Sequence, residues 1–229
     1  MCNILSIETA TNVCSVVVSV GNKIVFQKEN TEGPSHASLL GVFVAEALDA
    51  VRTDNVRLDA VAVSCGPGSY TGLRIGVSEA KGLCYGMGIP LLAIKTPEIM
   101  VKKVLETQVV PQNALLCPMI DARRMEVYAA VYDSDLNIIR DIAADIVEAD
   151  TYSLYLENSQ VFFLGNGAEK CRSVINNPNA VFIEDIYPSA HYMVNLAVDA
   201  YKMKQFVDVA YFEPFYLKDF IATTPKKLL

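Results

Sequence analysis

The sequence predicts a two-lobed α/β protein whose mixed β-sheets are flanked by helices. Three observations lead to this fold class. Antiparallel hairpins open both halves of the 229-residue chain, strands and helices alternate after each set of hairpins, and the second half repeats the plan of the first. The halves meet near residues 95–113. We therefore expect one lobe over residues 1–100 and a second over residues 101–229.

In the first half, short apolar runs bounded by polar turns predict the strands, and capping residues predict the helix ends. Gly21-Asn22 is typical of a hairpin turn, Ser35 is a candidate N-cap, and Thr96 with Pro97 is typical of a helix start. The expected strands are 3–7, 14–20, 23–30, 59–64 and 91–94, and the expected helices are 36–50, about 70–85 and 97–109.

The second half follows the same pattern. A glycine turn, Gly165-Asn166-Gly167, leads into one of its helices. The chain is expected to end irregularly, with a basic tail that includes Lys226 and Lys227. The expected strands are 114–120, 126–132, 138–142 and 161–164, and the expected helices are 151–157, 168–175 and 190–203.

Composition limits what the chain can be. Hydrophobic residues make up 52% of it, yet no run reaches the ~20 apolar residues of a membrane helix, and the N-terminus lacks the basic segment of a secretory signal. We therefore expect a cytoplasmic protein whose surplus apolar residues lie in a buried sheet or a subunit interface. The net charge of −7 argues against a free-standing nucleic-acid binder. Six cysteines without C-x-x-C spacing indicate buried, reduced thiols.

The helix near residues 70–85 is unusual because it carries Gly72, Gly76 and Gly82 in its interior. Each interior glycine costs roughly 0.5–1 kcal/mol relative to alanine. That cost indicates that another backbone packs close to this helix. The preceding helix, at 36–50, is apolar nearly all the way round, which is typical of a helix buried on two sides.

Two interpretations of these helices are open. They either pack against their counterparts from a partner, in a four-helix contact, or are buried between the lobes of one chain. The first predicts that Gly76→Leu weakens association while the chain stays folded, and the second predicts a lower melting temperature. The expected partner interface is His36, Leu39, Leu40, Phe43, Gly72, Leu73, Gly76, Val77 and Ala80.

Three segments resemble known motifs. ILSIETATNVCS at residues 4–15 resembles the first phosphate hairpin of the actin–hexokinase–Hsp70 superfamily. GPGSYTGLRIG at 66–76 and IDARRMEVY at 120–128 together resemble the bacterial TsaB (YeaZ) family, and the resemblance extends over essentially the whole chain. It implies an actin-like fold and a part in the machinery that places threonylcarbamoyl on N6 of adenosine 37 in tRNA.

The same resemblance implies a non-catalytic scaffold or dimerisation subunit. In the family, TsaB pairs with TsaD, a catalytic paralogue that holds a metal, and the ATPase TsaE joins them. We therefore expect TsaD and TsaE as partners, a homodimer as a second possibility, contact with tRNA only through the complex, and no membrane partner. A stand-alone ATP-dependent small-molecule kinase or a metallopeptidase-like enzyme is the alternative.

The catalytic paralogue holds its metal with a His-x-x-x-His pair on one helix face, because two histidines four residues apart reach the same ion. Here the helix begins at His36, position 40 is Leu40, and His191 lies far along the chain. We therefore expect no catalytic residue and no metal. Ser69 is not favoured as a nucleophile, because no histidine is placed to act as its base.

A nucleotide or anion pocket is a further possibility. The first hairpin of the superfamily carries an Asp that holds the metal and phosphate, and Glu8 stands at that place here. These residues could equally be inherited turns that shape the fold. No cofactor is expected on the isolated chain, with ATP or ADP a candidate ligand of the complex. The candidate pocket is Glu8, Thr9, Thr11, Arg74, Asp121, Arg123, Gly165 and Gly167, where arginine–aspartate pairs could bind a carboxylate or phosphate.

Overall fold

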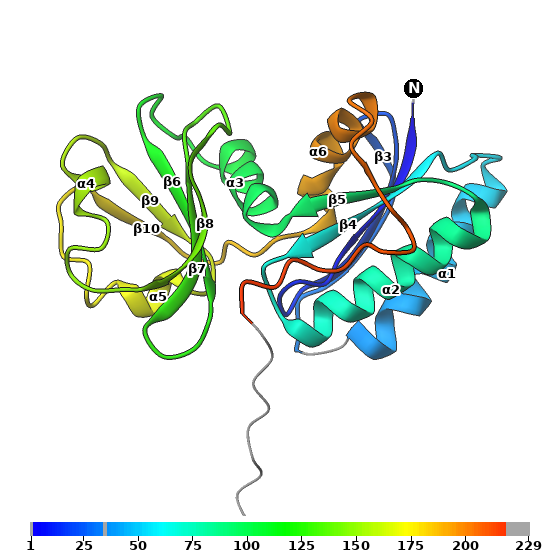
Figure 1. Cartoon of the computed structure of the whole chain (residues 1–229). Helices are drawn as coiled ribbons and strands as arrows, with labels where there is room; N and C mark the ends of the chain where they lie inside the picture. The colour runs from blue at the N-terminus through cyan, green and yellow to red at the C-terminus, as the bar shows by residue number, and fades with distance from the viewer. Residues whose placement is uncertain (1, 34–35, 219–229) are drawn as a thin grey trace, which may run out of the picture.

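The computed structural model describes residues 2–33 and 36–218, which form two α/β lobes lying side by side (Figure 1). Each lobe is built on one mixed sheet, with six strands in the first and five in the second. The predicted fold class, mixed sheets flanked by helices, is confirmed.

The first lobe holds three antiparallel strands, two parallel strands and two long helices from the N-terminal part of the chain. Its sheet has the order β11-β5-β4-β1-β2-β3, in which β1 pairs antiparallel with β2 and parallel with β4. Its elements are β1 (Asn3–Glu8), β2 (Cys14–Val20), β3 (Lys23–Asn30), α1 (His36–Thr53), β4 (Ala60–Gly66), α2 (Tyr70–Met87), β5 (Leu91–Lys95), α6 (Ala190–Lys202) and β11 (Phe206–Val207).

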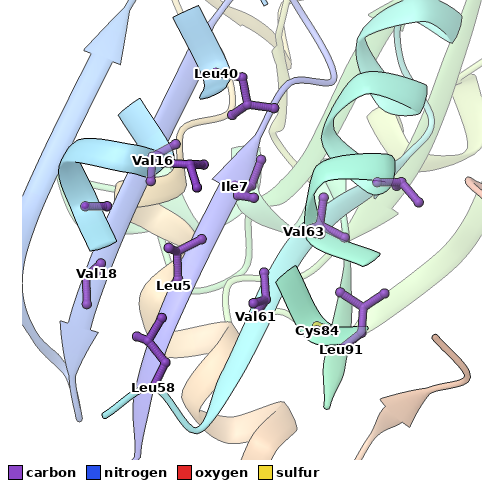
Figure 2. Close-up of a cluster of buried hydrophobic side chains, with 14 of the residues drawn as sticks. Leu5, Ile7, Val16, Val18, Leu40, Leu58, Val61, Val63, Cys84 and Leu91 are labelled. Carbon is purple, nitrogen blue, oxygen red and sulfur yellow. The ribbon is translucent and has the colours of Figure 1, made fainter. Parts of the chain in front are cut away.

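The central strands of this sheet are buried on both faces, which explains why their sequences are continuous apolar runs. Leu5 and Ile7 of β1 lie in the cluster that α1 and α2 cover (Figure 2). Ile4 points to the opposite face, where it packs with Met193 of α6. Helices α1 and α2 therefore form one layer, and α6 covers the other side of the sheet.

The second lobe is built on the strand order β10-β9-β6-β7-β8. Helix α3 (Thr96–Thr107) lies between the lobes, because its Ile99 packs with the first lobe while Met100 and Val104 pack with the second. The remaining elements of this lobe are β6 (Leu115–Asp121), β7 (Glu126–Tyr132), β8 (Ile138–Ile146), α4 (Ser153–Leu156), β9 (Val161–Leu164), α5 (Ala168–Cys171) and β10 (Ala180–Ile183).

The chain returns to the first lobe near its end. Helix α6 packs on β1 and β2, and β11 pairs antiparallel with β5, with Phe206 opposite Leu92. Residues 190–207 therefore belong with the first lobe. A boundary at residue 100 would assign them to the second. Local periodicity predicts the helix but not the sheet on which it packs.

Smaller differences concern element ends. Strand β8 runs on to Ile146, helix α5 stops at Cys171, and the short strands β10 and β11 were not predicted. Thr96 is the first residue of α3 rather than its cap, because Lys95 occupies the N-cap without a side-chain hydrogen bond. The expected cap Ser35 and the tail lysines Lys226 and Lys227 lie outside the described residues.

The cysteines and the helices agree with two limits drawn from composition. All six cysteines are buried free thiols. In the described part of the chain, no helix is both long enough and apolar enough to span a membrane.

Candidate functional site

The turn between β1 and β2, where the superfamily hairpin was predicted, is a buried structural centre. Glu8 has no exposed surface, and its Oε1 accepts a hydrogen bond from the Ala10 N–H at 2.5 Å. Its other carboxylate oxygen has no partner among the described residues. Burial raises the pKa of Glu8 to about 7, although hydrogen bonds from Ala10 and Ser64 act in the opposite direction. Glu8 thus lies under the surface instead of facing a ligand.

Thr9 explains two of the helical glycines. Its Oγ1 donates a hydrogen bond to the Gly72 carbonyl of α2 at 2.8 Å. A Cβ atom added to Gly72 would overlap the Thr9 carbonyl oxygen, and one added to Gly76 would overlap Thr9 Oγ1. These glycines therefore admit the hairpin of the same chain, not a helix of a partner. The close backbone approach was predicted correctly, but the neighbour was wrong.

His36, at the start of α1, ties that helix to the same hairpin. Its Nε2 lies 2.7 Å from the Thr11 carbonyl oxygen, so Nε2 carries the proton that is donated. Its Nδ1 is buried without a partner in the described structure. His191 lies on α6 with Nδ1 3.1 Å from Gln27 Oε1. Among the described residues, no group of three or more His, Cys, Asp or Glu side chains could hold a metal ion.

Most of the predicted partner interface faces inward. His36, Leu40, Gly72, Leu73, Gly76, Val77 and Ala80 are buried inside the chain, and Leu39 and Phe43 are partly buried. The prediction took the apolar residues themselves as the contact surface. It was wrong for the buried positions, because α1 and α2 direct these side chains onto their own sheet.

The opposite side of the same two helices is exposed, and we call it the outer helical surface. Val42 of α1 is 49% exposed and Tyr85 of α2 is 87% exposed. The first ten residues of α1, 36–45, include no Asp, Glu, Lys or Arg. A Cβ atom added to Gly41, Gly82 or Gly86 would meet nothing. The outer helical surface consists of Ala37, Ser38, Gly41, Val42, Ala45, Ser78, Gly82, Tyr85 and Gly86, all exposed.

A cleft of about 560 Å³ lies between the lobes. Of the predicted pocket residues, Thr11, Asp121 and Arg123 line it. Arg74 is exposed on α2 and does not line the cleft, but its guanidinium stacks on the Tyr70 ring at 4.2 Å and its Nε donates to Tyr216 Oη at 3.2 Å, and both tyrosines are lining residues. Polar lining residues that were not predicted for this pocket are Asn12, Ser69, Tyr70, Thr71, Tyr128, Asn166, Tyr216 and Lys218.

The second glycine turn supports the far wall of the cleft. Gly165 has a φ of 98°, and a Cβ there would overlap Met119. The Gly167 N–H donates to the Met119 carbonyl at 3.0 Å. Asn166 Oδ1 accepts a hydrogen bond from the Asp121 N–H at 3.1 Å. The two glycines therefore let the turn pack closely on the end of β6, and Asn166 reaches into the cleft.

The charges around the cleft pair differently from the prediction. Asp121 forms an ion pair with Lys170, and Glu126 forms one with Lys218. The expected arginine–aspartate side-chain pair at this turn is thus replaced by two lysine–carboxylate pairs. The Asp121 side chain contacts only the main chain of Arg123: its Oδ1 accepts a hydrogen bond from the Arg123 N–H at 2.9 Å.

A segment at residues 206–218, which we call the C-terminal strap, forms one wall of the cleft. Lys81 of α2 donates hydrogen bonds to the carbonyl oxygens of Ala210 and Phe212, at 3.1 and 2.9 Å. The Phe215 N–H donates to the Cys65 carbonyl at 2.7 Å. The strap was not predicted from the sequence, because an irregular segment has no periodicity. Its tyrosines and phenylalanines were the available sign that it packs.

Comparison with known proteins shows the family to which the chain belongs. The family described as "TsaD: tRNA N6-adenosine threonylcarbamoyltransferase" matches residues 30–226. The chain therefore belongs to this family.

The relatives narrow the assignment to one branch. The chain is 28% identical to the tRNA threonylcarbamoyladenosine biosynthesis protein TsaB of Haemophilus influenzae, over 98% of this chain and 96% of that protein. It is 27% identical to TsaB of Escherichia coli, over 96% of each. A Pseudomonas aeruginosa crystal structure, described as similar to peptidase YEAZ, matches with a TM-score of 0.82 and 25% identity, covering 95% of this chain and 100% of that one. These likenesses place the chain in the TsaB (YeaZ) family.

Proposed function

We propose that this chain is a non-catalytic subunit for threonylcarbamoylation of N6 of adenosine 37 in tRNA, and that it acts by docking the catalytic paralogue TsaD. The observation that carries the proposal is the outer helical surface, where small and apolar residues on two adjacent helices are exposed and a Cβ atom added to Gly41, Gly82 or Gly86 would meet nothing in the described chain. The family membership and the names of the relatives support the pathway.

The surface has the composition of a helix-packing interface. Glycine, alanine and serine let the backbones of two helices approach closely, which favours four-helix packing. Tyr85 and Val42 supply exposed anchors, and Met87, 41% exposed, adjoins them. Tyrosine and methionine are enriched in protein interfaces, where buried anchors carry most of the binding energy. A paralogue with the same pair of helices would offer a matching surface.

The cleft supports a scaffold better than the alternative kinase or peptidase. Glu8, at the superfamily's metal–phosphate position, is buried, and an ionised phosphate could not approach it without exposing the hairpin core. His36 Nε2 is hydrogen-bonded to the Thr11 carbonyl, so it is not available as a metal ligand. We propose that the isolated chain neither binds a catalytic metal nor transfers threonylcarbamoyl, and that ATP or ADP binds only in the complex, which TsaE joins.

Val42→Glu tests the docking surface. A glutamate at this half-exposed position should leave the chain folded, whereas a charge buried without a partner in the interface is costly. We expect the dissociation constant for TsaD to rise at least about tenfold, which corresponds to about 1.4 kcal/mol. Sedimentation of the mixed proteins measures the binding, and a melting curve measures the fold.

Leu154→Glu is the matched control, because Leu154 is 70% exposed on α4 of the second lobe. It should leave TsaD binding unchanged. If Val42→Glu binds TsaD as tightly as the unsubstituted chain does, the outer helical surface is not the docking site. If the substitution changes only self-association, the surface serves a homodimer instead.

A further inference from the structure

The turn that joins β6 to β7 (Figure 1) has an uncommon backbone. Arg123 and Arg124 both have positive φ angles, 71° and 48°. Residues other than glycine seldom have a positive φ, and Asn and Gly adopt this region most readily. Two arginines therefore occupy a position for which the local backbone favours other residues. A local preference that is broken in this way is most often found at a functional site.

The carboxylates at the base of this turn are already neutralised by lysines. Lys170 forms an ion pair with Asp121 and also donates a hydrogen bond to the Glu126 carbonyl at 2.6 Å. Lys218 pairs with Glu126. Across residues 2–33 and 36–218, no carboxylate lies within ion-pair distance of either arginine. The two guanidiniums are therefore exposed cations that the chain itself does not use for pairing.

Both arginines lie at the edge of the interlobe cleft. Arg123 lines the cleft, and both arginines line the adjoining hollow, where Lys218 is paired with Glu126. This concentration of positive charge stands out on a chain whose net charge is −7. An acidic protein that gathers exposed cations on one rim has a local surface suited to an anionic partner.

We propose that Arg123 and Arg124 contact phosphates of the tRNA backbone when the chain is assembled in its complex. The inference rests on the proposed function, which makes tRNA the substrate of that complex. A guanidinium matches the geometry of a phosphate and is always charged. Neighbouring backbone phosphates offer two such groups in succession, whereas the cores of protein interfaces are depleted of charge.

Two phosphate contacts are too few to hold tRNA on an isolated acidic chain. They add to the affinity only when other subunits supply the rest of the positive surface. The proposal is therefore compatible with the expectation that this chain binds tRNA through the complex alone.

The test replaces the two arginines together by residues that adopt a positive φ more readily, Arg123→Asn with Arg124→Gly. The variant is assembled with TsaD and TsaE, and tRNA affinity is measured over a series of salt concentrations. We expect weaker binding at low salt, by several-fold, and a plot of log affinity against log salt that is shallower by about 1.5. The melting temperature of the chain should rise, because the turn is relaxed.

Two further variants separate charge from geometry. Arg123→Lys with Arg124→Lys keeps both charges and should retain most of the salt dependence. Arg57→Ala, which removes an exposed arginine in the loop after α1, should change neither affinity nor slope.

Unchanged affinity and slope for the Asn–Gly variant in a fully assembled complex would overturn the inference. Loss of assembly by a variant that melts at a higher temperature would also overturn it, because the turn would then dock a protein. The mass of the complex shows whether the unsubstituted chain assembles with TsaD at all. If the unsubstituted chain fails to assemble with TsaD, the proposed function is rejected and this inference with it.

Discussion

The inner face of the α1–α2 layer rests on the first hairpin of its own chain, whereas the outer face is exposed in the described part of the molecule. Both faces contain glycine. On the inner face, Gly72 and Gly76 leave the space that Thr9 occupies. On the outer face, Gly41, Gly82 and Gly86 leave space that is empty. One residue type in one pair of helices therefore has two different explanations.

This comparison teaches how helical glycines should be interpreted. A glycine in a helix interior lowers stability by about 0.5–1 kcal/mol relative to alanine. On the inner face the close contact with the hairpin offsets that cost within the chain. No such contact exists for the outer glycines in the residues that the structure describes, so nothing there offsets their cost. The outer face is accordingly the better candidate for a partner.

Gly76→Leu should have the largest effect. Its side chain would have to enter the space of Thr9, and overpacking of this kind costs about 3 kcal/mol or more when backbone must move. A urea titration of the isolated chain measures the loss of stability. We therefore expect this variant to destabilise the isolated chain, and no longer expect it to weaken association while the chain stays folded.

The inner and outer faces can be compared directly by Gly82→Leu, which places the same side chain where nothing lies within 4 Å. The isolated chain should tolerate it. Equal destabilisation by Gly76→Leu and Gly82→Leu would remove the distinction between the two faces.

Glu8→Gln tests whether the inner hairpin is as dry as its burial indicates. The folded-state pKa of Glu8 is raised to about 7 from an ordinary value of 4.5. The folded chain thus binds a proton that the unfolded chain releases, so this part of the stability is fully present below pH 4.5 and is lost as pH rises through about 7. Above pH 7 the glutamine variant should be more stable by up to about 3 kcal/mol.

Unfolding free energies measured from pH 4 to 9 check this prediction. The unsubstituted chain should lose stability between pH 4.5 and 7, and Glu8→Gln should remove that slope. Glu157→Gln, at an exposed position after α4, is the matched control and should leave the slope in place. A Glu8→Gln variant with an unchanged pH profile would show that water reaches the hairpin.

Gly82→Ala should have the smallest effect, with the opposite sign. Alanine is the better helix former, so the isolated chain should gain about 0.5–1 kcal/mol. Because the outer surface is proposed to receive another helix closely, the same methyl group should weaken binding to TsaD while it stabilises the chain. Urea denaturation and a binding titration measure the two quantities. Lower stability of the isolated chain would reveal an inner contact at this position.

Much of the fold followed from sequence. Strands β2, β3, β7 and β9 occupy the predicted residues, and the long elements agree to within a few residues except β8. The candidate site was harder to predict. Thr11, Asp121 and Arg123 do line the interlobe cleft, but Glu8 and Thr9 lie beneath it and Arg74 lies outside it. A motif shows that a turn exists without showing which of its side chains reach solvent.

The sequence by itself determined the order of the elements, the burial of the central strands and the family. Those properties depend on residue spacing over a few turns or on motifs that can be read directly. Only the tertiary structure decided that Gly76 faces Thr9 and that α6 and β11 return to the first lobe. It also decided that the carboxylates beside Arg123 form ion pairs with lysines. Each of these depends on contacts between residues far apart in the chain, and such contacts leave no local periodicity from which they could be predicted.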